Sequence, residues 1–285
     1  MEWSLFSRRV NRRWSASLIW NRYYTPRKCR EDAHFFRFLL EFLAESNYNQ
    51  ERLRDLLFLM GDCGVNTDPT RLPFLLTLYQ QYLEHQDSTA FVRKTSNLYT
   101  AGTLQRLTRH ENHEVRRAAV FALGFVGDYE SNHTLGCALL DDDRTVRTIA
   151  EDVIRTIWTR AGSEAERQEL GVIIRLNAAQ RHGEAVARAT KLIERAPWFA
   201  EVWHQRAVAQ AALGRVIEAI RDCHQTLEIN PYHFVAATSM GQAYLQLENH
   251  VSALECFRRA IRLNPGLEGV RAQVVRLTRM LEDSH

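Results

Sequence analysis

Three prolines stand 34 residues apart in the last third of the sequence, at Pro197, Pro231 and Pro265. Each follows an apolar helical run and precedes another, and proline stops one helix and suits the first turn of the next. A fixed period of this size is the signature of a solenoid, in which helix pairs stack and bury their apolar faces against their neighbours. The spacing therefore predicts an all-α chain that ends in repeated helix pairs.

The residues between the prolines repeat in kind as well as in spacing. Across residues 234–267, small and aromatic residues follow a fixed order that consists of Gly241, Tyr244, Ala253, Phe257, Ala260 and Pro265. In residues 200–233, an aromatic residue, two small residues and a proline fall on positions of the same pattern, at Trp203, Ala207, Ala219 and Pro231. Small residues let two antiparallel helices approach closely, and large aromatic residues fill the space beside them. This order resembles the tetratricopeptide repeat.

The resemblance implies three tetratricopeptide units and a capping helix over residues 163–285. A weaker copy precedes the two clear units, with Ala185 and Pro197 in register and Ile173 where a small residue is expected. After Pro265, many charges surround a helical stripe of apolar residues, as in a capping helix with one face in water. The stripe consists of Val270, Val274, Leu277 and Leu281.

The resemblance also implies a concave groove that holds another protein chain. Counting from the prolines, the positions of the first helices that packing leaves free are His204, Gln205, Val208, Thr238, Ser239, Gln242, Gln246, Gln273 and Arg276. Some family members bind an acidic C-terminal peptide there through Lys and Asn, but this chain has Leu170 and Ile174 at those positions of the first unit. The groove is thus mixed polar and apolar, which suits a helix or an extended peptide of modest charge.

A second repeat, with a slightly shorter period, lies upstream. The tripeptide EVR at 114–116 recurs as TVR at 145–147, and Glu111 in the preceding turn matches Asp142. This pattern resembles HEAT-like repeats and predicts them over residues 96–162. The acid is expected near a helix N-terminus, and the arginine is expected to bridge to the neighbouring repeat.

Residues 31–95 read as a further helical region, either degenerate repeats of the same solenoid or a separate cap. Apolar residues recur at helical spacing from Phe35 to Met60. The run over residues 66–85 predicts a helix that Asp68 caps and Pro69 opens.

Residues 1–30 form a basic aromatic arm. They contain eight Arg or Lys and one acid, Glu2, which gives a charge of +7, whereas the whole chain carries +3. Tryptophans and tyrosines are interleaved with five arginines of this arm, which are Arg8, Arg9, Arg12, Arg13 and Arg22. Such an arm could bind nucleic acid, lie on an anionic membrane, act as a transit peptide, or pack on the next helices.

Sequence motifs for catalysis are weak in this chain. His110 and His113 could share a helix face, but they fall at a turn and no third metal ligand follows from the spacing. Cys223 next to His224 could suggest a nucleophile, but Cys223 occupies a packing position of the repeat. No phosphate-binding or nucleotide-binding motif is found. We therefore expect no enzyme activity, no metal and no cofactor.

These observations predict a non-enzymatic scaffold or adaptor that binds a protein partner of unknown identity in the concave groove. The fold expected is an α-solenoid of HEAT-like helix pairs followed by tetratricopeptide units. The scattered cysteines suggest a reducing, cytoplasmic location, and no apolar stretch is long enough to span a bilayer. Two alternatives remain: a protein that the arm recruits to nucleic acid or an anionic membrane, and an enzyme on a HEAT-like scaffold.

Overall fold

Helices make up the ordered architecture of this chain. The computed structural model describes residues 72–283, and in this range every regular element is helical. The arm residues Arg8, Arg9, Arg12, Arg13 and Arg22 lie outside the described range. The helices expected before residue 72 lie outside it too.

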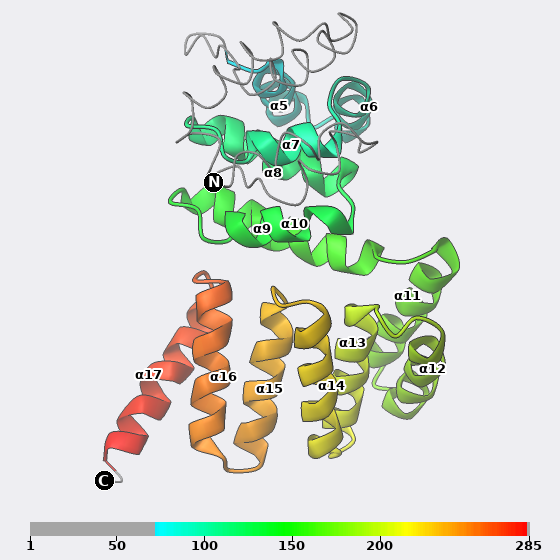
Figure 1. Cartoon of the computed structure of the whole chain (residues 1–285), viewed down its shortest axis with the longest axis vertical. Coiled ribbons are helices and arrows are strands. Elements are labelled where there is room, and N and C mark those ends of the chain that lie inside the picture. Colours follow the sequence, from blue (N-terminus) through cyan, green and yellow to red (C-terminus); the bar gives the residue numbers. More distant parts are fainter. Residues whose placement is uncertain (1–71, 284–285) are drawn as a thin grey trace, which may run out of the picture. The chain divides into compact units, whose positions relative to one another are not determined.

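The upstream half, which we define as residues 72–162, is a stack of helix pairs (Figure 1). Its elements are α5 (Phe74–His85), α6 (Ser88–Leu98), α7 (Ala101–Leu107), α8 (His113–Val126), the short 3-10 helix η2 (Tyr129–Ser131), α9 (Asn132–Ala138) and α10 (Arg144–Arg160). The continuous helix expected over residues 66–85 is wrong, because residues 72 and 73 are not helical, whereas its expected cap Asp68 and first residue Pro69 lie outside the described residues. Pro73 precedes α5, and the residue before a proline is disfavoured in the helical region. The helix therefore begins after it, at Phe74.

The same turn occurs twice in the upstream half, once before α8 and once before α10. Arg116 Nη1 donates to the carbonyl oxygens of His110 and Glu111, at 3.1 and 3.0 Å. Arg147 Nη1 donates in the same way to the carbonyls of Asp141 and Asp142, at 2.7 and 3.0 Å. Arg116 also reaches the next turn, where its Nε lies 2.8 Å from Asp141 Oδ2. Each arginine thus supports its own turn, and Arg116 joins two turns.

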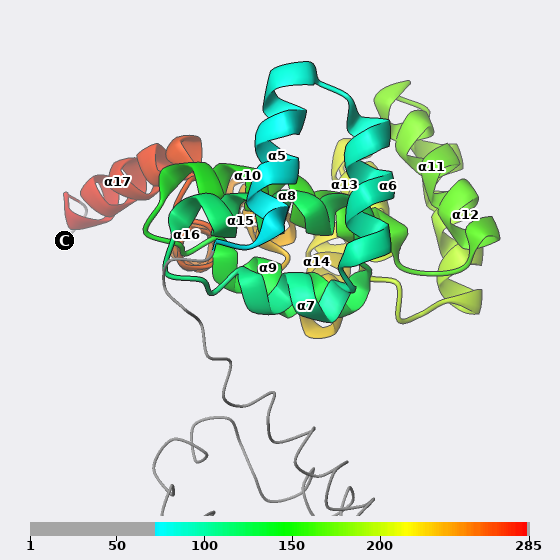
Figure 2. The same ribbon diagram turned by 90° about the horizontal axis from the view of Figure 1, so that it is seen from above.

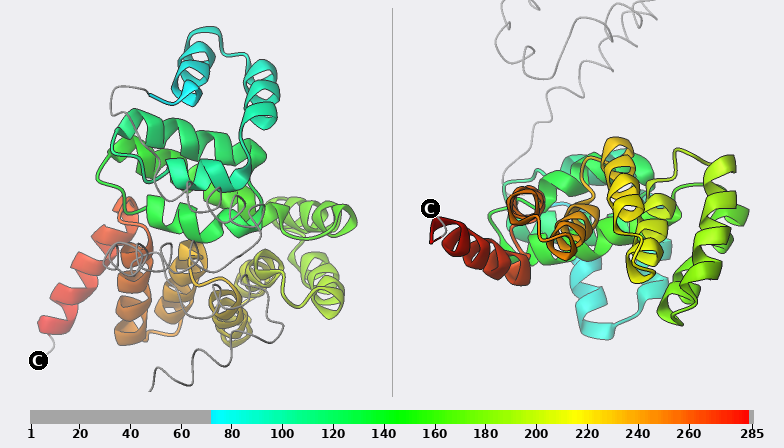
Figure 3. Two further views of the ribbon diagram at one scale, coloured as in Figure 1. Left: turned by 45° about the horizontal axis from the view of Figure 1, so that its top comes forward. Right: turned by 90° about the horizontal axis from the view of Figure 1, so that it is seen from below.

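The proline-spaced half, residues 163–283, consists of helices that stand side by side (Figure 1). They are α11 (Glu164–Ala178), α12 (His182–Arg195), α13 (Ala200–Ala212), α14 (Val216–Ile229), α15 (Phe234–Gln246), α16 (His250–Leu263) and α17 (Glu268–Glu282). We call α11, α13, α15 and α17 the A helices and α12, α14 and α16 the B helices. Seen from below, α12 to α17 follow one another around an arc (Figure 3).

Small residues bring the paired helices together, as the sequence indicated. A Cβ atom placed on Gly241 of α15 would lie 2.6 Å from the ring of Phe257 in α16. Phe257 and Ala253 are both buried at this contact. In the first pair, Ile173 stands where a small residue was expected, and it is fully buried as well.

The last helix packs by one face only. Val270 and Leu277 of α17 are buried, and Val274 and Leu281 are half-buried with them in the core that α13 to α17 share. These are the four residues of the expected apolar stripe. The opposite side of α17 is exposed and carries arginines together with the apolar residues Val275 and Met280.

The upstream half packs against the edge where the proline turns lie. Seen from above, α8, α9 and α10 overlie α14, α15 and α16 (Figure 2). Asn132 Nδ2 donates to Asn230 Oδ1 at 2.9 Å, and Asn264 Nδ2 donates to Glu151 Oε2 at 3.0 Å. The ring of Tyr232 lies directly on Gly136, where even a Cβ atom would collide with it. The turns that separate the repeats therefore form a docking edge for the preceding helices.

Replacing Gly241 by Leu should destabilise the chain. The larger side chain must displace the Phe257 ring, and overpacking of this kind costs about 1–3 kcal/mol. Thermal unfolding should therefore show a lower Tm. The control is Gly183→Leu in the first turn of α12, where a Cβ atom meets nothing within 4 Å. Equal melting of Gly241→Leu and wild type would refute the packing of α15 on α16.

Candidate functional site

The A helices carry the residues that the sequence placed in a groove, and their exposure differs widely. Gln242 and Gln246 on α15 and Arg276 on α17 are exposed. Half-buried positions are Gln205, Val208, Thr238, Ser239 and Gln273. His204 is only 5 % exposed and lies beneath the surface. The face available to a partner is therefore formed mainly by α15 and α17.

Hydrogen bonds between neighbouring A helices hold the buried part of this face in place. His204 Nε2 of α13 lies 3.3 Å from Ser239 Oγ of α15. Asn177 Nδ2 of α11 donates to the carbonyl and to the side-chain oxygen of Gln205, at 2.9 and 3.0 Å. These polar contacts link α11, α13 and α15.

Arg206 joins three successive helices at the side of the same face. Its Nε and Nη2 donate to the two carboxylate oxygens of Asp222 in α14, at 2.7 and 2.8 Å. Its Nη1 donates to Thr190 Oγ1 of α12 at 3.1 Å, and its guanidinium lies 4.9 Å from the centre of the Trp203 ring. A two-pronged arginine–carboxylate contact of this kind fixes geometry as well as charge.

A buried polar cluster lies at the ends of α13 and α15 that face the upstream half. His233 Nε2 lies 2.9 Å from Glu201 Oε2, and His204 Nδ1 lies 3.4 Å from Glu201 Oε1. Trp158 of α10 stacks on the His233 ring, with centroids 4.1 Å apart and planes inclined by 16°. Gln205 Nε2 donates to Glu201 Oε1 at 2.7 Å. We call Glu201, His204 and His233 the His–Glu cluster.

Burial and hydrogen bonding oppose each other in this cluster. Burial alone would raise the pKa of Glu201, but its contacts with His204 and His233 outweigh burial and hold that pKa below its usual range. Burial lowers the pKa of His233, and the bond to Glu201 offsets this only in part. Glu201 is therefore ionised and His233 is neutral near pH 7.

The three side chains of the cluster could be considered as metal ligands, because their ligand atoms lie within 4.8 Å of one another. The hydrogen bonds of His233 oppose this interpretation. His233 Nδ1 accepts from the Ala236 N–H at 3.0 Å and caps α15. The proton must then sit on Nε2, where it is donated to Glu201, whereas a nitrogen that binds a metal carries no proton. The cluster is better described as a buried hydrogen-bond network that holds α13 and the proline turn together.

The cysteine and the two histidines that the sequence singled out lie outside the His–Glu cluster. Burial raises the pKa of Cys223 to about 12, which disfavours the thiolate that a nucleophile requires. His110 Nδ1 accepts from the Asn112 N–H at 3.0 Å in the turn before α8. His113 is the exposed first residue of α8.

Sequence reasoning missed the His–Glu cluster, although one signal was present. Glu201 precedes His204 by three residues on one helix, so the two share a face. His233 lies in the proline turn, 32 residues after Glu201, and Trp158 belongs to the upstream half. Only the packing of α10 on that turn brings Trp158 to His233.

Replacing His233 by Asn should weaken the pH dependence of stability. His233 stays neutral when folded but is protonated in the unfolded chain below about pH 6.5, so its contribution is complete above that pH and declines as pH falls. Asn keeps a helix cap and does not titrate. The difference in Tm between about pH 7.5 and about pH 5.5 should therefore shrink.

The matched control is His224→Asn, on the exposed side of α14. It should leave the pH dependence close to that of wild type. If His233→Asn retains the wild-type difference in Tm, the buried neutral state of His233 is wrong.

Comparisons with known proteins give one family match and several partial relatives. The family model of the tetratricopeptide repeat matches residues 235–267. Hsp70-Hsp90 organizing protein 1 of Glycine max is 26% identical over 104 residues, which cover 35% of this chain and 18% of that protein. Protein SGT1 homolog of Bos taurus is 32% identical over 80 residues, which cover 28% of this chain and 24% of that protein. The chain thus spans less than a quarter of the length of these relatives.

Partial matches occur among solved structures. The first TPR of Spaghetti bound to an HSP90 peptide has a TM-score of 0.41 and 19% identity, and covers 42% of this chain and 96% of that one. The TPR2AB domain of yeast Sti1 in complex with pHSP90 has a TM-score of 0.38 and 18% identity. The match covers 72% of this chain and 90% of that one. Within residues 72–283, none of the helices has the length and apolar character that crossing a bilayer requires. By the match over residues 235–267, the chain contains a tetratricopeptide repeat.

Proposed function

We propose that this protein is a non-enzymatic interaction scaffold that binds a helix or an extended peptide of a partner on its A-helix face. The observation that carries the proposal is the tetratricopeptide repeat at residues 235–267, whose A helix presents Gln242 and Gln246 to solvent. Solenoids of this type use the surface that their first helices line to hold other chains. Curated relatives that match about a third of the chain include Hsp70-Hsp90 organizing proteins.

The proposed binding face comprises Gln205, Val208, Thr238, Ser239, Gln242, Gln246, Gln273 and Arg276, with His204 beneath it. Amide and hydroxyl groups can donate to and accept from the backbone of an extended peptide. Val208 adds apolar surface, and Arg276 adds one charge. The contacts of Arg206 and Asn177 pre-order the helices that carry these groups, which lowers the entropy cost of binding.

The chemistry of the first unit argues against a partner that is recognised by a terminal carboxylate. Leu170 is fully buried and Ile174 is half-buried, and both replace the polar residues that such recognition uses in the family. We therefore propose a partner segment of modest charge.

The upstream half supports the scaffold in this proposal. We propose that residues 96–162 are HEAT-like repeats, because the turn contacts of Arg116 recur at Arg147. The tetratricopeptide domain would then occupy residues 163–285, after residues 31–95 and the arm 1–30. A cytoplasmic location fits the free thiols of Cys137, Cys223 and Cys256. Docking of the arm on nucleic acid or an anionic membrane stays a prediction.

The binding face can be tested by capturing partners with the full chain. The variant Gln242→Glu, Gln246→Glu, Arg276→Glu adds negative charge to the proposed face and alters exposed residues only. Quantitative mass spectrometry of captured proteins should show a loss of roughly tenfold for the main partner, as expected for a change at the centre of an interface. Far-UV circular dichroism should stay unchanged.

The control variant is Arg221→Glu, Arg262→Glu on the exposed sides of α14 and α16. It changes the net charge by the same amount and should retain the partner. Capture that is equal for the two variants would exclude the A-helix face as the binding surface.

A further inference from the structure

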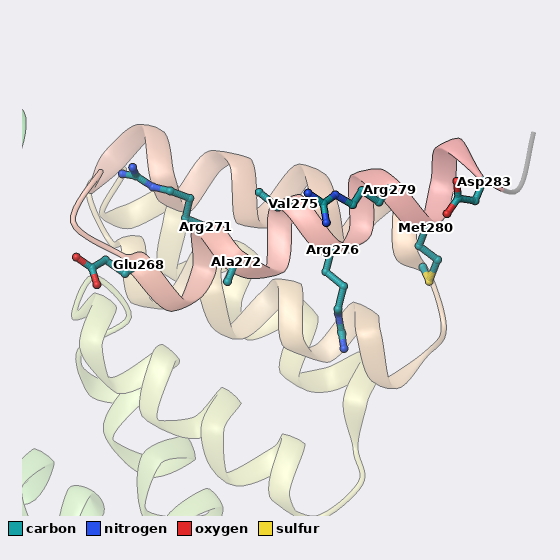
Figure 4. Close-up of a pocket in the computed structure, with 8 residues that line it drawn as sticks. All are labelled: Glu268, Arg271, Ala272, Val275, Arg276, Arg279, Met280 and Asp283. Carbon is teal, nitrogen blue, oxygen red and sulfur yellow. The ribbon is translucent and has the colours of Figure 1, made fainter.

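We infer that the exposed face of α17 binds an acidic amphipathic helix of a partner protein, in the place that a B helix occupies against each earlier A helix. We define the α17 open face by the residues Arg271, Ala272, Val275, Arg276, Arg279 and Met280 (Figure 4). The inference goes beyond the proposed function, because the side of an A helix that meets its B helix is not the groove side.

The repeat itself shows how an A helix is covered at this position. Ala207 in α13, Gly241 in α15 and Val275 in α17 are equivalent, since each lies 34 residues after the last. Ala207 is 1 % exposed, and Gly241 is buried under Phe257 of α16. Val275 is 47 % exposed, because within residues 72–283 no helix follows α17. The contact that is buried in the earlier units is therefore open in the last one.

The open face has the apolar surface and the hollow that a helix needs. A shallow depression of about 960 Å³, widely open to solvent, runs along α17 and ends at Glu268 and Asp283. Met280 is 39 % exposed and lies with Ala272 and Val275 along it. Val270 and Leu277 face the opposite way into the core, so α17 is apolar on two sides.

Charge specifies the occupant. Arg271, Arg276 and Arg279 border the apolar residues, and none of them forms an ion pair with an acid among the described residues. Arg271 Nη2 donates to the Pro265 carbonyl oxygen, which leaves its charge without a counter-charge. The lining thus carries three arginines along its length, and its two acids, Glu268 and Asp283, stand at its ends. Unpaired arginines beside an apolar strip attract a segment with Glu or Asp on its flanks. A second copy of this chain would bring like charges together, so charge disfavours self-association.

Shape adds a further requirement. In the α15–α16 pair, glycine on the A helix admits a phenylalanine from the B helix. Val275 fills that space on α17, so the bulky residue now lies on the A helix. The partner helix must therefore present a small residue where it crosses Val275, with larger apolar residues one turn away on either side.

The test uses two synthetic helical peptides and the full chain. Both peptides are stapled, about 15 residues long so that a helix is stable, and carry Ala at the crossing position with Leu one turn away. One peptide has Glu on both flanks, and the other has Lys at the same positions. Fluorescence anisotropy should show that the Glu peptide binds roughly tenfold more tightly or better, and that raising the salt concentration weakens it.

Two variants of the chain locate the binding. The double variant Arg271→Glu, Arg279→Glu should lower the affinity for the Glu peptide by roughly tenfold or more. The double variant Arg221→Glu, Arg262→Glu changes the charge by the same amount elsewhere and should keep the wild-type affinity. Val275→Lys is the second variant, and it should weaken binding through the apolar contact if the double variant fails to fold. Arg276 is left unchanged because it also belongs to the proposed groove.

Three results would overturn the inference. The first is equal affinity for the Glu and Lys peptides. The second is unchanged binding of the Glu peptide in both Arg271→Glu, Arg279→Glu and Val275→Lys. The third is a concentration-dependent dimer of the free chain that Val275→Lys abolishes, since the face would then be occupied by a second copy. The groove variant changes Arg276, which also lines the open face, but the variants Arg271→Glu, Arg279→Glu and Val275→Lys change no residue of the proposed groove. Peptide binding to the open face can therefore fail or succeed independently of the groove.

Discussion

The edge formed by the proline turns is the constraint on which the rest of this structure depends. Because the prolines recur every 34 residues, the turns between units fall at the same end of successive helix pairs. Phe199, the N-cap residue of α13, and Phe234, the first residue of α15, are completely buried there. Phe234 joins the core of the upstream half, and Trp158 stacks beside it on His233. The two halves therefore share one core at this edge.

This arrangement leaves the other surfaces of the A helices free. The turn ends of α13 and α15 are closed by Trp158 and by the His–Glu cluster, whereas Gln242, Gln246 and Arg276 further along remain exposed. A buried carboxylate that hydrogen-bonding partners satisfy rigidifies its surroundings. The cluster thus fixes the turn ends of α13 and α15. The proposed partner binds the exposed parts of the A helices beyond these ends.

The sequence was most informative where contacts are local. The prolines, the Gly241–Phe257 contact and the apolar stripe of α17 all follow from periodicity within about 35 residues, which is the reach of a repeat. The contact between Asn132 and Asn230 spans 98 residues, and nothing in the local pattern indicates it. His204 was placed on the groove surface because its position in the repeat is a free one, but Glu201, Ser239 and His233 surround it. Tertiary neighbours from another turn decided its burial.

The most direct test of the shared edge is a double-mutant cycle between Asn132 and Asn230. Each residue is changed to Ala alone and both are changed together, and the free energy of unfolding is measured for all four chains. Direct contact predicts a coupling energy of about 0.5–3 kcal/mol between the two substitutions. Additive effects, with a coupling energy near zero, would contradict the packing of the upstream half on the proline turns.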